Sequence, residues 1–113
     1  MHEMSLVEGV LQVIEDSARA NHFSRVKTVC LEIGALSGVE PEAISFCFDL
    51  VMKGTLADGA RLEIIATEGQ GWCHTCGQTV AVRQRHDPCP LCGGYQVQPN
   101  GGMEMKVKEL EVE

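Results

Sequence analysis

Long apolar runs are missing from this chain of 113 residues. A helix that crosses a membrane needs at least about 18 consecutive apolar residues, and no stretch approaches that length. No Lys or Arg precedes Arg19, so the basic and then apolar pattern of a secretion signal is also missing. We therefore expect a soluble protein that stays in the cytoplasm, without a membrane span.

Basic residues are scarce as well. The chain has 9 Lys and Arg residues against 16 Asp and Glu residues, and its formal net charge is -7. A surface of this sign repels the phosphates of nucleic acids, and between residues 69 and 99 only Arg83 and Arg85 supply positive charge. No nucleic acid is expected as a partner.

Cysteine, in contrast, is plentiful. Disulfides would require an oxidising compartment, whereas Cys-x-x-Cys pairs in an intracellular protein indicate metal ligation. Isolated cysteines behave as small buried hydrophobes, so Cys30 and Cys47 are predicted to lie in the core. The four paired cysteines are Cys73, Cys76, Cys89 and Cys92.

The first half of the chain predicts two helices separated by a strand. Apolar residues recur at helical spacing from Ser5, and Ser5 with Glu8 matches a capping box, which would leave Met1 to Met4 as a short arm ahead of the helix. Residues 25–33 are rich in β-branched side chains and predict a strand. Pro41 suits the first position of the second helix.

The second half predicts two strands that enclose an insertion. Residues 61–68 and 103–112 alternate between apolar and polar side chains, with a change of parity near Lys108 and Glu109 that suggests a β-bulge or a late turn of the strand outward. We expect an α+β fold, with two helices packed on a three-stranded sheet and an inserted zinc-ribbon-like domain that carries the four paired cysteines. The α+β domain would comprise residues 1–68 and 100–113, and the zinc-binding domain residues 69–99.

The inserted cysteines predict a closed structural zinc site. Two residues between cysteines let both thiolates reach one ion from a tight turn, and two such turns supply four ligands. A closed four-cysteine site leaves no position for a substrate, so catalysis is not expected. Iron in a rubredoxin-like site and a redox dithiol are the alternatives, while His74 and His86 are interpreted as solvated loop residues rather than ligands.

The amino terminus offers a second set of metal ligands. A free α-amine of Met1, the imidazole of His2 and the backbone nitrogen of Glu3 could enclose an ion that favours planar nitrogen coordination. Ni(II) and Cu(II) have this preference. Such a site exists only if nothing precedes Met1.

Four features together resemble the HypA/HybF family of nickel metallochaperones. The chain opens with Met-His-Glu-x-Ser-Leu, continues with Ile33-Gly34-Ala35-Leu36-Ser37 and Phe46-Cys47-Phe48-Asp49, and carries the inserted Cys-x-x-Cys pairs. The resemblance implies a nickel site at Met1, His2 and Glu3, with Glu40 as an additional candidate ligand. Several relatives have a histidine soon after each cysteine pair, whereas this chain has Gln78 and Gly94, so exchange of such histidines with thiolates is not expected.

The resemblance also implies a function that is not enzymatic. A protein of this family takes up nickel and delivers it, with a partner GTPase (HypB), to the precursor of the [NiFe]-hydrogenase large subunit, and some members also supply urease. Whether the chain forms a homodimer is left open. The rival interpretations are a zinc-stabilised protein–protein adaptor, a nucleic-acid-binding zinc ribbon, and a dithiol oxidoreductase that uses Cys73 and Cys76.

Overall fold

The computed structural model describes residues 3–113 as two compact units. Of the described residues, the first unit comprises 3–32, Val39–Ile65 and Lys106–Glu113, and the second comprises Ile33–Gly38 and Ala66–Met105. Met1 and His2, which the sequence predicts as nickel ligands, lie outside the described residues. The predicted domain limits at residues 69 and 99 stay a prediction.

In the first unit, helix α1 runs over Glu3–Asn21 and begins earlier than the sequence pattern indicates. The capping box at Ser5 is therefore wrong, because Ser5 lies within the first turn of the helix. The predicted arm is wrong as well for Glu3 and Met4, which belong to the helix. Glu3 occupies the first turn, where a carboxylate is stabilised by the positive end of the helix dipole. The apolar stripe is as predicted, since Val7, Val10 and Ile14 are buried.

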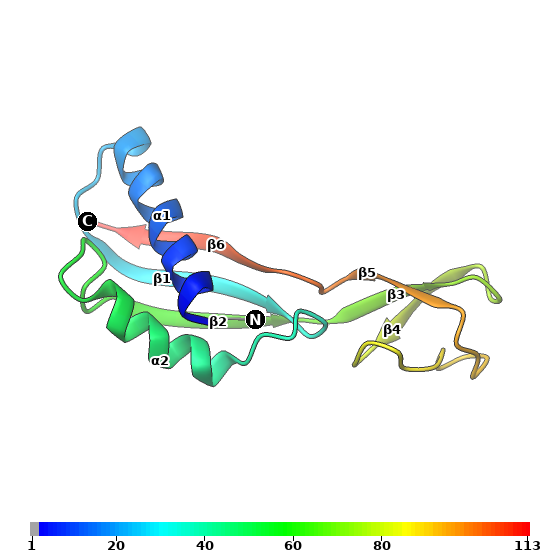
Figure 1. The fold of residues 1–113 in the computed structure, drawn as a ribbon. Helices are drawn as coiled ribbons and strands as arrows, with labels where there is room; N and C mark the ends of the chain where they lie inside the picture. Colours follow the sequence, from blue (N-terminus) through cyan, green and yellow to red (C-terminus); the bar gives the residue numbers. More distant parts are fainter. Residues whose placement is uncertain (1–2) are drawn as a thin grey trace. The chain divides into compact units, whose positions relative to one another are not determined.

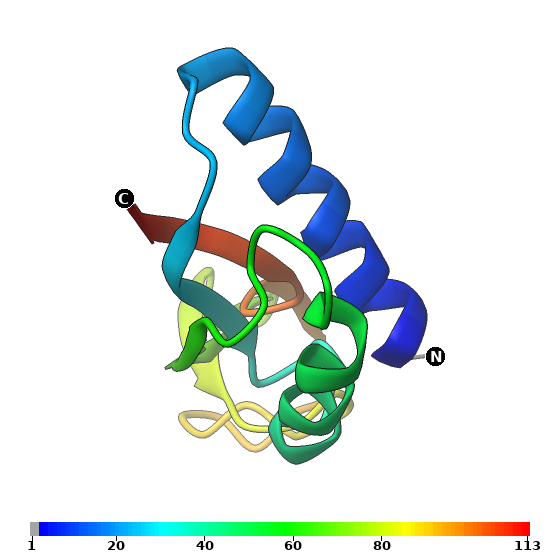
Figure 2. The ribbon, with the colours of Figure 1, turned by 90° about the vertical axis from the view of Figure 1, so that its left-hand side faces the viewer.

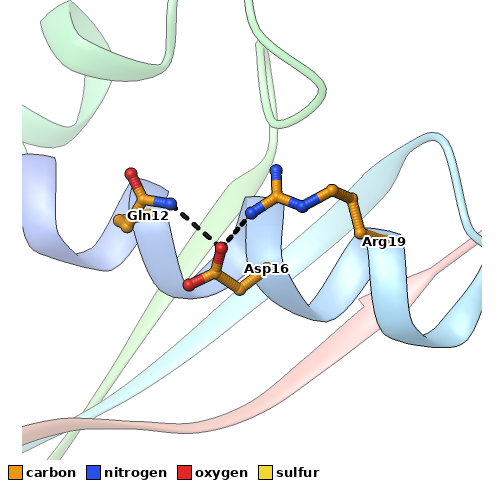
Figure 3. Close-up of polar contacts among 3 residues, drawn as sticks. All are labelled: Gln12, Asp16 and Arg19. Carbon is orange, nitrogen blue, oxygen red and sulfur yellow. Dashed lines mark hydrogen bonds and ion pairs between the residues drawn. The ribbon is translucent and has the colours of Figure 1, made fainter.

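The exposed side of α1 carries a small polar network (Figure 3). The Asp16 carboxylate accepts a hydrogen bond from Gln12 Nε2 at 3.0 Å and pairs with the Arg19 guanidinium one turn later. Pairs at these helical spacings stabilise a helix by about 0.2–0.5 kcal/mol each. The network therefore supports the helix locally and forms no site.

The first unit is built on a sheet with the strand order β2-β1-β6. The arrowheads of β1 (Val26–Gly34) and β2 (Arg61–Thr67) point the same way in Figure 1, while β6 (Met105–Val112) runs in the opposite direction. A parallel pair needs a crossover, which α2 (Pro41–Met52) provides between β1 and β2. Thr28 Oγ1 donates to Glu111 Oε1 at 2.8 Å, which links β1 to the end of β6.

Both helices cover one face of this sheet (Figure 2). From α2 the side chains of Ile44, Cys47 and Phe48 are buried, and from β1 those of Val29, Cys30 and Leu31. The structure thus confirms the predicted core positions of Cys30 and Cys47, and it confirms the α+β fold with two helices on a three-stranded sheet.

The last strand differs slightly from its prediction. It begins at Met105 rather than Met103, whose side chain is exposed. Lys108 and Glu109 are both exposed while Val107 and Leu110 are partly buried, so the predicted change of parity is present. The alternating pattern identified the strand, but the turn residues before it decided where it starts.

The second unit contains an antiparallel sheet with the strand order β4-β3-β5. Strand β3 (Gly69–Cys73) lies in the centre, pairing Trp72 with Thr79 of β4 (Gln78–Val82) and with Gln98 of β5 (Val97–Gly101). The register of β3 against β5 shifts between Gln70 and Gly71. This sheet carries the first cysteine at its end, since Cys73 is the last residue of β3.

Residues Ile33–Gly38 belong to this second unit through backbone hydrogen bonds. Ala35 N donates to Thr67 O at 2.9 Å, and Leu36 N donates to Gly102 O at 2.8 Å. These bonds hold the segment beside the two chain passages that enter and leave the cysteine-bearing sheet. The end of β1 and the residues that follow it therefore belong to the unit that holds the cysteines.

Candidate metal centre

Each Cys-x-x-Cys pair lies on a tight turn that ends at a glycine. Gly77 N donates to Cys73 O at 2.8 Å, and Gly93 N donates to Cys89 O at 2.8 Å. Both glycines adopt left-handed backbone conformations, with φ of 65° and 74°. A side chain with a Cβ rarely adopts this conformation, which is why the sequence Cys-x-x-Cys-Gly produces the same turn twice.

The two turns bring four sulfur atoms together. Cys73 Sγ lies 3.8 Å from Cys92 Sγ, and Cys76 Sγ lies 3.9 Å from Cys89 Sγ. All four Sγ atoms lie within 4.8 Å of one another. In a tetrahedron with metal–sulfur bonds of about 2.3 Å the sulfurs are about 3.8 Å apart, so the cluster has the dimensions of a four-thiolate metal site.

Backbone amides favour the ionised form of one thiol in the cluster. The N–H of Cys92 and, to a smaller extent, that of Leu91 lower the pKa of Cys89 from 9.0 to about 7, against the opposing effect of burial. Leu91 N lies 3.4 Å from Cys89 Sγ. Cys89 is therefore disposed to act as a thiolate ligand near neutral pH.

A neighbouring thiol is shifted in the opposite direction. Hydrogen bonding to the Cys92 side chain, followed by burial, raises the pKa of Cys76 to about 12. Thiols this close share protons, because several negative charges within a few ångströms repel one another. A bound divalent cation removes that repulsion and deprotonates its sulfur ligands, so the donor set fits a metal ion.

The cluster is anchored on a small apolar core. Leu36, Val80 and Val82 are buried together with Cys73 and Cys89, and Cys76 and Val97 pack against them. Val80 and Val82 lie within the predicted zinc-binding domain of residues 69–99, whereas Leu36 lies outside it and was not placed beside the cysteines. The stretch from Ile33 to Ser37 was visible as a motif, yet its spacing from the cysteines gave no signal that it packs against them.

The neighbouring histidines stand apart from the cluster. His74 and His86 are exposed, and His86 has a left-handed backbone with φ of 71°. Within residues 3–113 the four cysteines are the one group of three or more His, Cys, Asp or Glu side chains arranged to hold a metal. The arrangement agrees with the interpretation of both histidines as loop residues.

The candidate nickel ligands are only partly described. Glu3 is half-buried in the first turn of α1, while Met1 and His2 lie outside the described residues. Glu40 is exposed at the N-cap position of α2, and its side chain makes no capping hydrogen bond. Its carboxylate is therefore not engaged in holding the helix.

These features define a small α+β protein that carries a four-cysteine metal centre on an inserted three-stranded sheet. A family model described as hydrogenase/urease nickel incorporation, metallochaperone, hypA, matches residues 1–112. The chain belongs to the HypA family, which confirms the resemblance seen in the sequence.

Individual relatives agree with this assignment. The hydrogenase maturation factor HypA of Albidiferax ferrireducens is 62% identical over 113 residues, and that of Dechloromonas aromatica is 61% identical, each alignment covering 100% of both chains. The solution structure of the Ni metallochaperone HypA from Helicobacter pylori has the same fold, with a TM-score of 0.75 at 24% identity over 99% of this chain and 97% of that chain. Within the described residues no helix is long and apolar enough to cross a membrane.

Proposed function

We propose that this member of the HypA family binds Ni(II) at its amino terminus and delivers it to the precursor of the [NiFe]-hydrogenase large subunit. The match of the family model to residues 1–112 carries the proposal. The α-amine of Met1, the imidazole of His2 and the backbone nitrogen of Glu3 are the proposed ligands, and Ni(II) favours such nitrogen donors. A ligand set at a chain end is accessible, which suits a carrier that must release its cargo.

The four cysteines have a different duty in this proposal. Cys73, Cys76, Cys89 and Cys92 hold a structural zinc ion, because a closed tetrahedral set of four sulfurs is typical of zinc and leaves no position for exchange. Few apolar residues are available to fold the second unit, so the metal contributes much of its folding free energy. The protein then works by binding and transfer rather than by catalysis.

Glu40 is a further proposed nickel ligand. Its exposed carboxylate is free of a capping role at the start of α2, as described above. Glu42 provides a matched control, because it is an exposed glutamate in the first turn of the same helix. Glu40→Gln is expected to weaken nickel binding, whereas Glu42→Gln is expected to leave it unchanged.

The proposal places the protein in the cytoplasm, where thiols stay reduced, with a HypB-like GTPase and the hydrogenase precursor as partners. A homodimer is part of the same proposal. Transfer can be measured as nickel incorporated into the purified precursor, with and without the GTPase. Equal incorporation from free Ni(II) in the absence of this protein would argue against delivery.

One experiment tests the nickel site directly. Nickel binding is compared between the authentic terminus, a form extended by two residues before Met1, and His2→Gln, with zinc content measured in all three. Glutamine is chosen because a bulky second residue leaves Met1 in place. Loss of nickel binding with zinc retained supports the proposal, while unchanged binding in both altered forms moves the site elsewhere or favours the adaptor.

Zinc itself is tested by elemental analysis. About one zinc per chain, with little iron, is expected after purification without added metal. A coloured protein that contains iron would indicate a rubredoxin-like site instead.

A further inference from the structure

The four cysteines of the metal centre differ sharply in their exposure to solvent. Cys73 and Cys89 are 0% and 2% exposed, and Cys76 is partly buried, whereas Cys92 is exposed. Zinc-bound thiolates keep some nucleophilic character, and the rate at which a small reagent reaches them depends on access. Exposure alone therefore singles out Cys92.

Hydrogen bonding adds a second, independent difference. Cys76 N lies 3.4 Å from Cys73 Sγ, and Leu91 N lies 3.4 Å from Cys89 Sγ. An N–H that points at a thiolate withdraws negative charge from the sulfur and lowers its reactivity. Across the part of the chain that the structure describes, Cys92 Sγ contacts other thiols, including that of Cys73 at 3.8 Å, and no backbone donor is recorded for it or for Cys76 Sγ. Cys92 differs from Cys76 in being exposed as well.

We infer that Cys92 is the modification site of the metal centre. Small uncharged electrophiles, including hydrogen peroxide, react with this thiolate first, and its modification releases the metal. The inference rests on the proposed ligation of zinc by the four cysteines. A thiolate that is both exposed and free of amide donors reacts before its three neighbours, and its loss as a ligand loosens the metal.

The chemistry balances with peroxide as the oxidant. The Cys92 thiolate attacks one peroxide oxygen, forming an S–O bond while the O–O bond breaks and hydroxide leaves. Cys73 Sγ, 3.8 Å away, then attacks the Cys92 sulfur, forming an S–S bond and releasing a second hydroxide. Two thiolates together lose two electrons, one peroxide gains them, and two ligands are withdrawn from zinc.

The chain offers a variant that shields Cys92 without removing a ligand. A Cβ added at Gly94 would lie 3.5 Å from Cys92 Sγ, which is ordinary van der Waals contact, and Gly94 is not in the left-handed region. Gly94→Ala should therefore fold normally while covering part of the sulfur. Gly9→Ala on α1, where an added Cβ meets nothing within 4 Å, is the matched control.

The first test uses limiting iodoacetamide on the full-length, zinc-loaded protein, followed by mass spectrometry of its peptides. The expected result is alkylation of Cys92 before any other cysteine, with zinc release following at the same rate. Gly94→Ala should slow both events at least about twofold, and Gly9→Ala should change neither. Alkylation of Cys76 first, equal reaction of all four cysteines, or an unaltered rate in Gly94→Ala would overturn the inference.

The second test treats the zinc-loaded protein with hydrogen peroxide. Zinc release into a chromogenic chelator should accompany a disulfide between Cys73 and Cys92 and should be reversed by a dithiol reductant. A dominant disulfide between Cys76 and Cys89 would contradict the inference. Zinc content before treatment separates the proposed zinc site from the proposed role of Cys92. A purified chain without zinc would overturn the zinc site itself. A zinc-loaded chain that reacts at another cysteine would overturn only the role of Cys92.

Discussion

Arg85 Nε donates a hydrogen bond to Leu36 O at 3.0 Å, joining the loop between the two cysteine pairs to a segment 49 residues earlier in the chain. Leu36 is at the same time buried among Cys73, Cys89, Val80 and Val82. Leu36 therefore fixes the segment Ile33–Gly38 in two ways, since its side chain is buried in the apolar cluster and its carbonyl oxygen accepts the partly buried hydrogen bond from Arg85. We therefore expect the order of that segment to depend on the folding of the four-cysteine cluster.

Replacing Arg85 tests the polar half of this link. Arg85→Ala removes a hydrogen bond with a charged donor at a partly exposed carbonyl, and we expect a loss of about 1 kcal/mol in the unfolding free energy of the second unit. Faster hydrogen exchange should appear at the amides of Ala35 and Leu36, measured by mass spectrometry or NMR. Arg83→Ala is the control, and equal effects of the two substitutions would mean that charge rather than the hydrogen bond matters.

Replacing Leu36 tests the apolar half. Leu36 is 2% exposed, so Leu36→Ala leaves a cavity and should cost about 2–4 kcal/mol in a urea unfolding curve of the zinc-loaded protein. Leu91→Ala, at a side chain that is 64% exposed, should change stability by less than about 0.5 kcal/mol. Similar midpoints for both variants would show that Leu36 is not part of the core that supports the cysteines.

Removing zinc should unfold the second unit and spare the first. The cluster around the cysteines is small, while both helices belong to the first unit and pack on their own core. Trp72 is the single tryptophan and lies on β3, so its fluorescence reports on the second unit alone. We expect a strong chelator to change this fluorescence while the far-UV signal of the helices persists.

Adding zinc back after chelation is the control for that experiment, since it should restore the Trp72 fluorescence under reducing conditions. A parallel loss of helical signal on chelation would show that the two units unfold together. That outcome would contradict the expected independence of the core formed by α1, α2 and their sheet.

Acid should weaken nickel binding. An unperturbed imidazole titrates near about pH 6.5 and an α-amine near about pH 7.8, and protons compete with the metal for both nitrogens. Nickel affinity measured from pH 7.5 to pH 6 is therefore expected to fall, because the ligand nitrogens of His2 and Met1 become protonated. A constant affinity across this range would be incompatible with terminal nitrogen ligation.

The convergence of the four paired cysteines could be predicted from the sequence, because the geometry of each pair is local. Two residues between cysteines and a following glycine determine each turn, and the structure confirms the left-handed glycines and the convergence of four sulfurs. The core positions of α2 were predictable for a similar reason, since burial there follows helical periodicity. In β1 the consecutive residues Val29, Cys30 and Leu31 are all buried, so strand alternation alone does not account for its core positions. The start of α1 could not be predicted, because a serine is acceptable both inside a helix and at its N-cap. The structure shows that the helix begins at Glu3, which places Ser5 inside it.

The sequence by itself determined the family, the fold class and the two Cys-x-x-Cys turns, since motifs and periodicity are properties of neighbouring residues. Tertiary structure alone decided which cysteine is exposed to solvent and that Leu36 packs beside the cysteines. Cys76 and Cys92 hold equivalent places in two nearly identical motifs, yet their burial differs because exposure depends on what the rest of the chain lays over each turn. Packing between segments distant in sequence is a long-range property, and no local pattern encodes it.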